Sequence, residues 1–366
     1  WDAGDIRYNV LRWTASPNPP FGGYGPSFTN PRTGQIIGAD IMLEFSFLTN
    51  RLRIKDVLQP SGLAPHRSGR LCDLGAHMRM DQLFAAQALT ANGVGSGLRA
   101  QLIEDSMYML ILHEIGHTLG LTHNMRASQL QPNVFDESAV AATGLSGSVM
   151  DYEAVNVAPP GQPQTPFYQN RPGLYDLWAI EYGYAPSLAD DSAEQQRLET
   201  LLARSTEPEL AYGNDADDMR RPGRGIDPHI NIYDHSGDAV GYAEQRLQLV
   251  RTMRSDLLKN HRGETYQALY NSHVLLMNQL SRSGGVVSRY VGGVHINRAP
   301  PGTSEVPPYR AVDAGQQRRA MKVLATYIFA PDALAGSERV FQHLQQQRRG
   351  FDFYEEPEDP KLHEMM

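Results

Sequence analysis

The sequence is poor in cysteine, in long apolar runs and in clustered positive charge. Cys72 is the single cysteine among 366 residues, so the chain cannot form an internal disulfide. The longest apolar stretch, residues 107–112, is far shorter than the roughly 18 residues that span a membrane. The net charge is −8, and no basic tract resembles a nucleic-acid-binding surface. We therefore expect no membrane span in this chain and no nucleic-acid partner.

The N-terminus also lacks the pattern of a signal peptide, because no charged segment is followed there by an apolar one. The chain begins with Trp1 rather than methionine, which suggests a processed protein or a piece of a longer one. Hydrophobic residues make up 41% of the chain and charged residues 20%. This composition is typical of a globular protein that buries a core.

The first 95 residues are rich in β-formers, glycine and proline. Residues 6–13 are a predicted strand, and so are residues 36–47, where apolar side chains recur at every second position from Ile41. The proline- and glycine-rich residues 17–31 between them are predicted to form a loop. A helix is predicted at residues 81–91.

The remainder of the chain is predicted to be largely helical. Residues 98–119 form one long predicted helix that stops near Gly120, and residues 175–182 form another that is closed by Gly183. Three sets of apolar residues at helical spacing then predict helices that face a core: Leu247, Val250, Met253 and Leu257; Tyr266, Leu269, His273, Leu276 and Leu280; Met321, Leu324 and Ile328. We expect an α+β fold, with one domain over residues 1–185 and a mainly helical region over residues 186–366.

One motif, HEIGHTLGLTH, carries the chemistry. His113 and His117 lie one helical turn apart, so their imidazoles project from the same face. Glu114 points about 100° around the helix, which suits contact with a metal-bound water rather than with the metal. Gly120 permits the sharp turn that brings His123 back as a third ligand. Three histidines leave one coordination position open, which predicts a catalytic rather than a structural zinc ion.

This motif resembles the extended zinc-binding motif of the metzincin metallopeptidases. That family has a methionine turn beneath the zinc site, and the segment SVMDY around Met150 resembles it. Met150 lies 27 residues after His123 (150 − 123 = 27). Astacins and serralysins have a tyrosine two residues after this methionine, and Tyr152 stands at that position. The resemblance implies that Tyr152 approaches the metal and helps to stabilise a tetrahedral intermediate.

A wider resemblance covers most of residues 1–185 and, more loosely, the helical region. The segments NPRTG, at residues 30–34, and YDLWAIEYGY are similar to a group of large bacterial zinc-dependent metallopeptidases with a metzincin domain. The resemblance implies a catalytic domain over residues 1–185, in which a twisted mixed sheet packs against the long helix. It also implies secretion or export to the periplasm or cell envelope.

These residues predict a zinc-dependent endopeptidase that acts on peptide or protein substrates. Zinc would lower the pKa of its bound water and polarise the scissile carbonyl. Glu114 would take the proton of that water and return it to the leaving amine. Two alternatives stay open: a zinc-binding module that has lost catalysis, and a zinc hydrolase that acts on a non-peptide amide.

Metzincins bind extended substrate along an edge strand, and residues 36–47 are either that edge or an ordinary internal strand. Residues 214–218 (NDADD) read as a solvated acidic turn rather than a calcium site. Asn124 stands where some metzincins have an aspartate, so the group that orients His123 is open. A second group of possible ligands lacks a recognised spacing, and capping or surface roles are expected for its members: Asp227, His229, Asp234 and His235.

Overall fold

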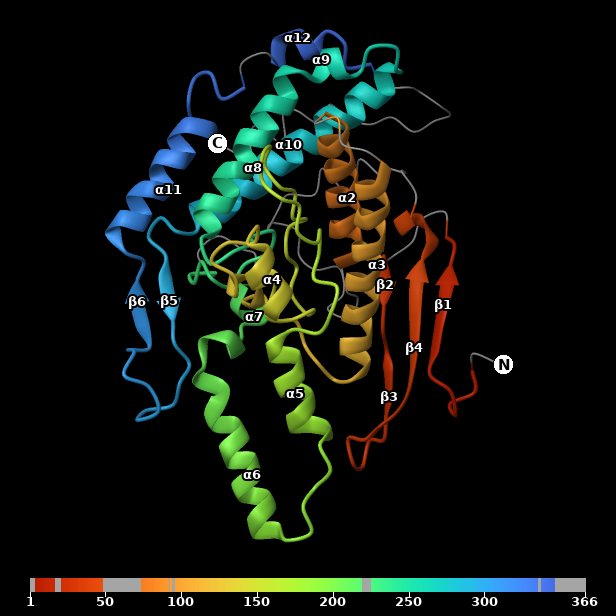
Figure 1. Cartoon of the computed structure of the whole chain (residues 1–366), viewed down its shortest axis with the longest axis vertical. Helices are drawn as coiled ribbons and strands as arrows, with labels where there is room; N and C mark the ends of the chain where they lie inside the picture. Colours follow the sequence, from red (N-terminus) through yellow and green to blue (C-terminus); the bar gives the residue numbers. More distant parts are fainter. Residues whose placement is uncertain are drawn as a thin grey trace.

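A computed structural model describes residues 4–16, 21–48, 74–91, 93, 96–218, 225–334 and 337–345. Cys72 lies outside these residues. The regular elements of the described chain are helices and strands in two small sheets, which confirms the predicted α+β class. Figure 1 shows the first sheet beside α2 (Leu74–Ala91) and α3 (Ser96–Thr118). On the far side of these two helices lie α8 (Ala239–Ser255), α10 (Tyr266–Ser288) and α11 (Ala314–Tyr327). No helix of the described residues is long and apolar enough to cross a membrane.

β4 (Ile36–Glu44) is the central strand of the first sheet. β1 (Val10–Thr14) pairs with it in parallel. On its other side, β2 (Gly23–Tyr24) and then β3 (Ser27–Thr29) pair with it antiparallel. The sequence left open whether residues 36–47 form an edge or an internal strand, and pairing on both sides makes β4 internal.

β2 and β3 form the edge of the described sheet that lies beside α3 (Figure 1). The prediction of a loop over residues 17–31 was wrong for these two strands. They escape detection because they are very short, and because glycine and proline are depleted in strands. The two predicted strands also differ from their predictions at one end each. β1 begins at Val10 rather than at residue 6, and β4 ends at Glu44, where a 3₁₀ turn, η1 (Phe45–Leu48), follows.

Two long helices follow the sheet, α2 (Leu74–Ala91) and α3 (Ser96–Thr118). α2 begins before the predicted residue 81, whereas α3 closely matches its prediction. Gly120 follows α3 with a φ of 90°, a left-handed conformation that glycine adopts without steric cost. The predicted role of Gly120 in ending this helix is therefore confirmed.

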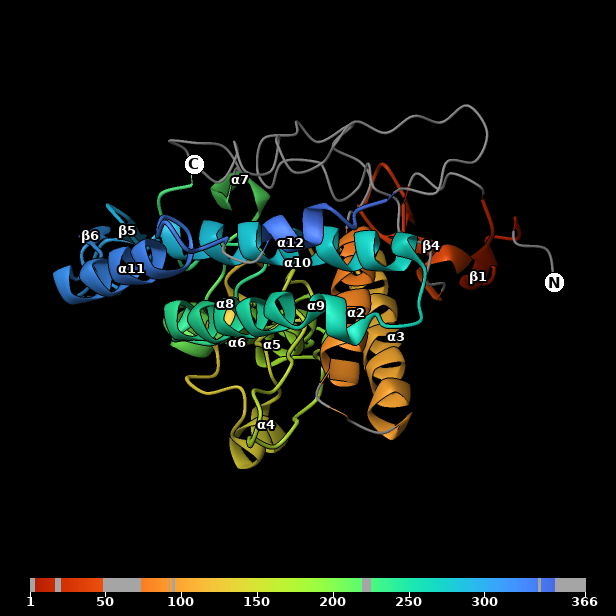
Figure 2. The same ribbon diagram turned by 90° about the horizontal axis from the view of Figure 1, so that it is seen from above.

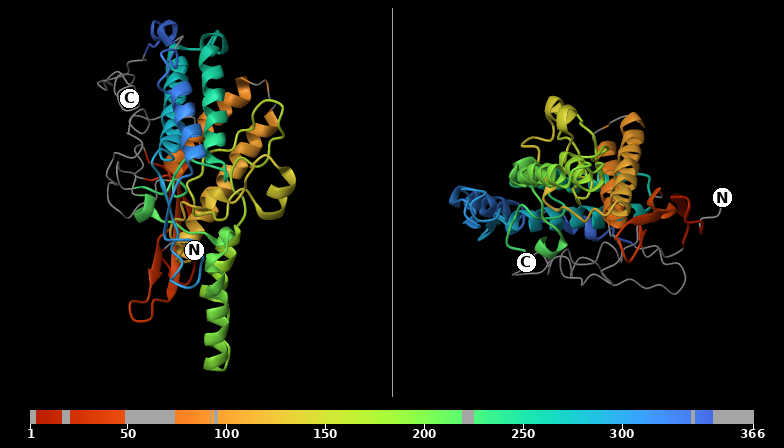
Figure 3. Two further views of the ribbon diagram at one scale, coloured as in Figure 1. Left: turned by 90° about the vertical axis from the view of Figure 1, so that its left-hand side faces the viewer. Right: turned by 90° about the horizontal axis from the view of Figure 1, so that it is seen from below.

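A largely irregular stretch leads from α3 to α5 (Leu174–Tyr184). Gly183 lies inside α5, so the prediction that this glycine closes the helix was wrong. The helix ends instead where Ala185 is extended, with a ψ of 137°, because the residue before a proline is disfavoured in the helical conformation. Figure 3 shows α6 (Asp191–Ala203) reaching away from the other helices. The short elements of this middle part are η2 (Ala127–Gln129), α4 (Glu137–Thr143), α6 (Asp191–Ala203), η3 (Arg204–Thr206), η4 (Pro208–Leu210) and α7 (Asp215–Asp218).

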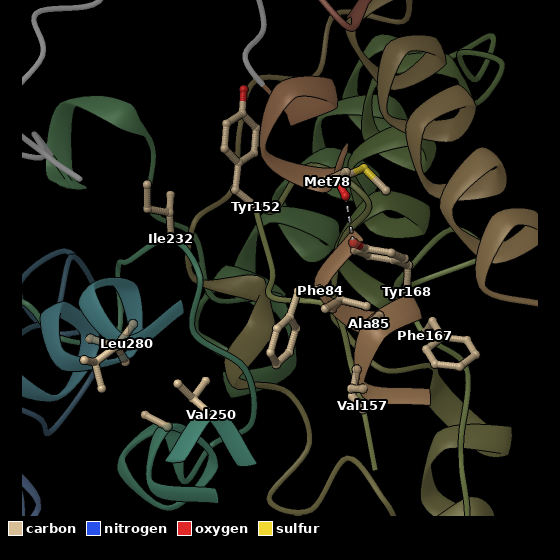
Figure 4. Close-up of a cluster of buried hydrophobic side chains, with 14 of the residues drawn as sticks. Met78, Phe84, Ala85, Tyr152, Val157, Phe167, Tyr168, Ile232, Val250 and Leu280 are labelled. Carbon is tan, nitrogen blue, oxygen red and sulfur yellow. Dashed lines mark hydrogen bonds between the residues drawn. The ribbon is translucent and has the colours of Figure 1, made fainter. Parts of the chain in front are cut away.

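The second half of the chain is mainly helical, and α8 and α10 run side by side (Figure 2). One hydrophobic core extends from Leu43 in β4 and Leu110 in α3 to Val250 in α8 and Leu276 in α10. Figure 4 shows part of this core, in which side chains from distant segments meet. The elements of this half are α8 (Ala239–Ser255), α9 (Leu257–Asn260), α10 (Tyr266–Ser288), β5 (Val294–Ile296), β6 (Tyr309–Ala311), α11 (Ala314–Tyr327) and α12 (Ser337–Phe341).

The three predicted apolar stripes fall on these helices. The stripe from Leu247 to Leu257 is buried throughout, as expected. Two members of the other stripes are instead exposed: Tyr266 at the start of α10 by 53% and Met321 in α11 by 49%. In α11 the fully buried residues are Ala320 and Val323. Leu324 and Ile328 are partly buried and pack against the core as predicted, so only Met321 departs from the predicted stripe.

Candidate metal centre

Three histidines converge at the end of α3. His113 and His117 lie on the helix, and His123 follows in the loop after Gly120. The ring centroid of His113 is 4.7 Å from that of His117 and 5.3 Å from that of His123. The Nε2 atoms of His117 and His123 are 3.1 Å apart. One potential ligand atom from each of the three residues lies within 4.8 Å of the others.

Each imidazole has its Nδ1 atom beside an acceptor. Nδ1 of His113 is 2.7 Å from the carbonyl oxygen of Val149, and Nδ1 of His117 is 3.1 Å from that of Leu121. Nδ1 of His123 is 2.6 Å from Oδ2 of Asp215. These acceptors place the proton of each neutral ring on Nδ1 and leave the lone pair on Nε2.

The protonation state of the histidines favours a bound cation. Burial, and then the neighbouring histidines, lower the pKa of His113 well below its ordinary value and that of His117 to about 4. His117 and His123 face each other through Nε2 atoms that carry no proton when Nδ1 of each ring donates to its acceptor. Their 3.1 Å separation is close to the edge of a zinc tetrahedron, roughly 3.3 Å for Zn–N bonds of about 2.0 Å. The donor set therefore fits a zinc ion.

Glu114 lies beneath the edge strand β2. Glu114 directly follows the first histidine in the sequence, and its side chain is fully buried. A β-carbon on Gly23 would overlap Oε1 of Glu114, and one on Gly25 would overlap the Glu114 main-chain oxygen. The absence of side chains at Gly23 and Gly25 lets the strand pass this close to the glutamate. Neither glycine was singled out in the sequence.

Met150 lies directly beneath the helix that bears the first two histidines. A β-carbon on Gly116 would overlap its sulfur atom, so a larger residue at position 116 would displace the methionine. The Met150 carbonyl oxygen accepts a hydrogen bond of 2.9 Å from the main-chain N–H of Asn124. This hydrogen bond joins the segment around Met150 to the loop that bears His123.

Tyr152 reaches the histidine cluster with its hydroxyl group. Its oxygen is 3.3 Å from Nε2 of His123, and the two ring centroids are 4.9 Å apart. The main-chain N–H of Tyr233 donates to the Tyr152 carbonyl at 2.9 Å. The Tyr233 hydroxyl lies 2.5 Å from Nδ1 of His77, whose ring packs beside that of Tyr152. Tyr152 is thus held between α2 and the second half of the chain.

Asp176, at the start of α5, was not predicted as a site residue. Its buried carboxylate accepts hydrogen bonds from the Ser148 hydroxyl, from Val149 N–H at 2.9 Å and from Gly173 N–H at 2.8 Å. Burial raises the pKa of this carboxyl group. Asp176 thereby fixes the two residues that precede Met150. Asp176 stands in the first turn of a predicted helix, where aspartate often accepts hydrogen bonds from free main-chain N–H groups. This position was the sequence feature that could have identified it.

The acidic segment 214–218 lies against the metal centre. Asp215 is the residue whose carboxylate contacts His123, and its side chain remains 43% exposed. The hydrogen bonds of Asn124 run to other groups. Its side chain instead joins the His123 loop to residues 211–213, accepting from Gly213 N–H at 3.1 Å and donating to the Ala211 carbonyl at 3.1 Å.

The second group of possible ligands follows its prediction in part, since Asp227 caps a turn by accepting from His229 N–H at 3.0 Å. Asp234 and His235 are buried rather than on the surface. His295 joins Asp227 and His229, and one potential ligand atom from each of these three lies within 4.8 Å of the others. Asp227 already accepts from Arg126 at 3.2 Å and from the N–H of Ile296 at 2.9 Å. The charge of Arg126 balances that of the Asp227 carboxylate. The cluster of Asp227, His229 and His295 therefore stabilises the loop after His123.

The Met-zincin family matches residues 96–366. Because this is well over half of the chain, the protein belongs to that family. The matched region includes the three histidines, Met150 and Tyr152. Met-zincins are zinc metallopeptidase-like proteins, in keeping with three convergent histidines that are able to hold a metal ion. No curated protein and no solved structure matches the chain.

Proposed function

We propose that the protein is a zinc-dependent endopeptidase whose zinc ion is held by His113, His117 and His123. The observation that carries this proposal is the convergence of the three rings with every Nδ1 atom facing an acceptor. This arrangement supplies up to three Nε2 donors and leaves a coordination position for a catalytic ligand. Family membership supports the same metal.

The residues around the histidines support a hydrolytic mechanism. A zinc ion held there would act as a Lewis acid and would lower the pKa of a coordinated water. The carboxylate of Glu114 accepts the proton of the attacking water and delivers it to the leaving nitrogen. The Tyr152 hydroxyl donates a hydrogen bond to the oxyanion that develops on the scissile carbonyl. Met150 and Gly120 have structural roles, beneath the site and at the turn to His123.

An extended peptide substrate would bind along the edge formed by β2 and β3. These strands end the described sheet on the side of α3, and Gly23 and Gly25 lie against Glu114. Main-chain pairing of a peptide with this edge would bring a scissile bond close to the glutamate. The edge strand proposed here is therefore residues 23–29 instead of residues 36–47.

A substrate screen tests this proposal against its two alternatives. The zinc-loaded protein is incubated with a peptide library and, separately, with small amide-bearing molecules, and each reaction is repeated after zinc removal. We expect zinc-dependent cleavage within peptides. Hydrolysis of small amides alone would identify a non-peptide hydrolase, and stoichiometric zinc without turnover of any substrate would identify a silent zinc-binding module.

A further inference from the structure

The three imidazoles are not supported in the same way. His113 and His117 belong to α3 and direct their Nδ1 atoms at main-chain carbonyls. His123 lies outside the helix, and its Nδ1 atom faces the carboxylate of Asp215 at 2.6 Å. A histidine in a loop lacks the support of helical hydrogen bonds, so its ring needs a partner to fix its direction.

The segment that bears Asp215 is held against the loop of His123. The main-chain N–H of Met125 donates to the Gly213 carbonyl at 2.7 Å. The hydroxyl groups of Thr122 and Tyr212 are 2.6 Å apart. Together with the two bonds of Asn124, these contacts place residues 211–213 beside both chain neighbours of His123.

The short helix α7, which begins at Asp215, is also fixed in place. The side chain of Asn214 accepts from Ala216 N–H at 2.9 Å, and Asp217 accepts from Asn214 N–H at 3.0 Å. Asp217 in addition forms an ion pair with Arg298. Asp215 thus projects toward His123 from the first residue of α7, a short helix that Asn214 caps at its start and that Asp217 anchors to a distant loop.

We infer that Asp215 is a positioning residue of the metal centre. Its carboxylate accepts the Nδ1 proton of His123, which fixes the ring and its tautomer and strengthens Nε2 as a donor to the metal. The carboxylate lies 92 residues beyond His123, in the region proposed as the helical part of the chain. That region therefore completes the zinc site. This inference rests on the proposed zinc ligands.

Zinc affinity of the full chain, measured by competition with a chelator, tests the inference. Asp215→Ala removes the acceptor, and Asp215→Asn keeps an acceptor oxygen without its charge. Glu209→Gln removes one negative charge from an exposed residue of η4, a short way before Asp215 in the chain, and serves as the matched control. We expect Asp215→Ala to weaken zinc binding by about 10- to 100-fold, Asp215→Asn by less, and Glu209→Gln to have no effect.

Two further measurements separate positioning from general stability. Urea unfolding of the zinc-free variants reports whether the fold itself is changed. The visible absorption of the cobalt(II)-loaded proteins reports the ligand geometry, and it should shift in the Asp215 variants alone.

His123→Ala distinguishes a failure of this inference from a failure of the proposed function. Wild-type zinc affinity in Asp215→Ala, together with its loss in His123→Ala, would overturn the role of Asp215 only. Wild-type affinity in both variants would overturn the proposed ligand set and the inference that rests on it.

Discussion

The main chain of Gly23 lies directly against the carboxylate of Glu114. A β-carbon at this position would overlap Oε1, so no side chain fits between the strand and the carboxylate of the proposed general base. The two residues are far apart in the sequence, and β4 and α3 bring them together. The position of the glutamate thus depends on the sheet edge as well as on its own helix.

Gly23→Ala should displace the Glu114 carboxylate and reduce peptide cleavage by about 100-fold, because small misplacements of a catalytic group have effects of this size. Zinc content should be unchanged, since the atoms nearest to the added β-carbon belong to Glu114 and Leu110 and not to the histidines. Gly97→Ala is the matched control, because no atom lies within 4 Å of the added β-carbon. Wild-type cleavage by Gly23→Ala would show that this contact does not constrain the glutamate.

Tyr152→Phe should lower kcat by about 100-fold with little change in KM, because one hydrogen-bond donor to the developing oxyanion is lost. Zinc stoichiometry should remain at the wild-type value. Tyr168→Phe removes the hydroxyl of another fully buried tyrosine, which bonds to Met78 O in the core (Figure 4), and should leave kcat unchanged. Equal kcat values for Tyr152→Phe and wild type would exclude Tyr152 from catalysis.

Glu153 links stability to pH. Burial raises its pKa to about 8, and Nδ1 of the buried His235 lies 3.8 Å away. Burial and the Arg246 charge lower the pKa of His235 to about 3, so both groups are neutral near pH 7. The folded protein holds the Glu153 proton more tightly than the unfolded chain does. This contribution to the free energy of unfolding is therefore lost as the pH rises through about 8.

Urea unfolding of the zinc-free protein at about pH 6.5 and about pH 8 measures this effect, because His235 is neutral in both states over most of that range. Glu153→Gln should lose less stability than wild type between the two pH values. Glu199→Gln, an exposed carboxylate on α6, should behave as wild type. An identical pH dependence in Glu153→Gln and wild type would contradict the raised pKa.

Local patterns in the sequence predicted the parts of the structure that depend on local geometry. The length of α3, the turn at Gly120 and the shared face of His113 and His117 follow from helical spacing alone. The alternation within β4 likewise identified a strand, although not its place in the sheet. The position of a strand depends on its partners, and β2 and β3 carry almost no pattern of their own.

The residues that were missed act across long distances in the chain. Asp215 meets His123 across 92 residues, and Asp176 meets Val149 across 27. Neither spacing is a property of a helix, a strand or a turn. An aspartate that binds a main-chain N–H or an imidazole looks the same in sequence as one that is solvated, so only the folded structure reveals these partners.

Zinc content and peptide cleavage, measured side by side in wild type and Glu114→Gln, test the central claim most directly. We expect one zinc ion per chain in both proteins and a rate of cleavage about 1,000-fold lower in Glu114→Gln, since the variant keeps the histidines but lacks the general base. The absence of stoichiometric zinc from both proteins would contradict the account.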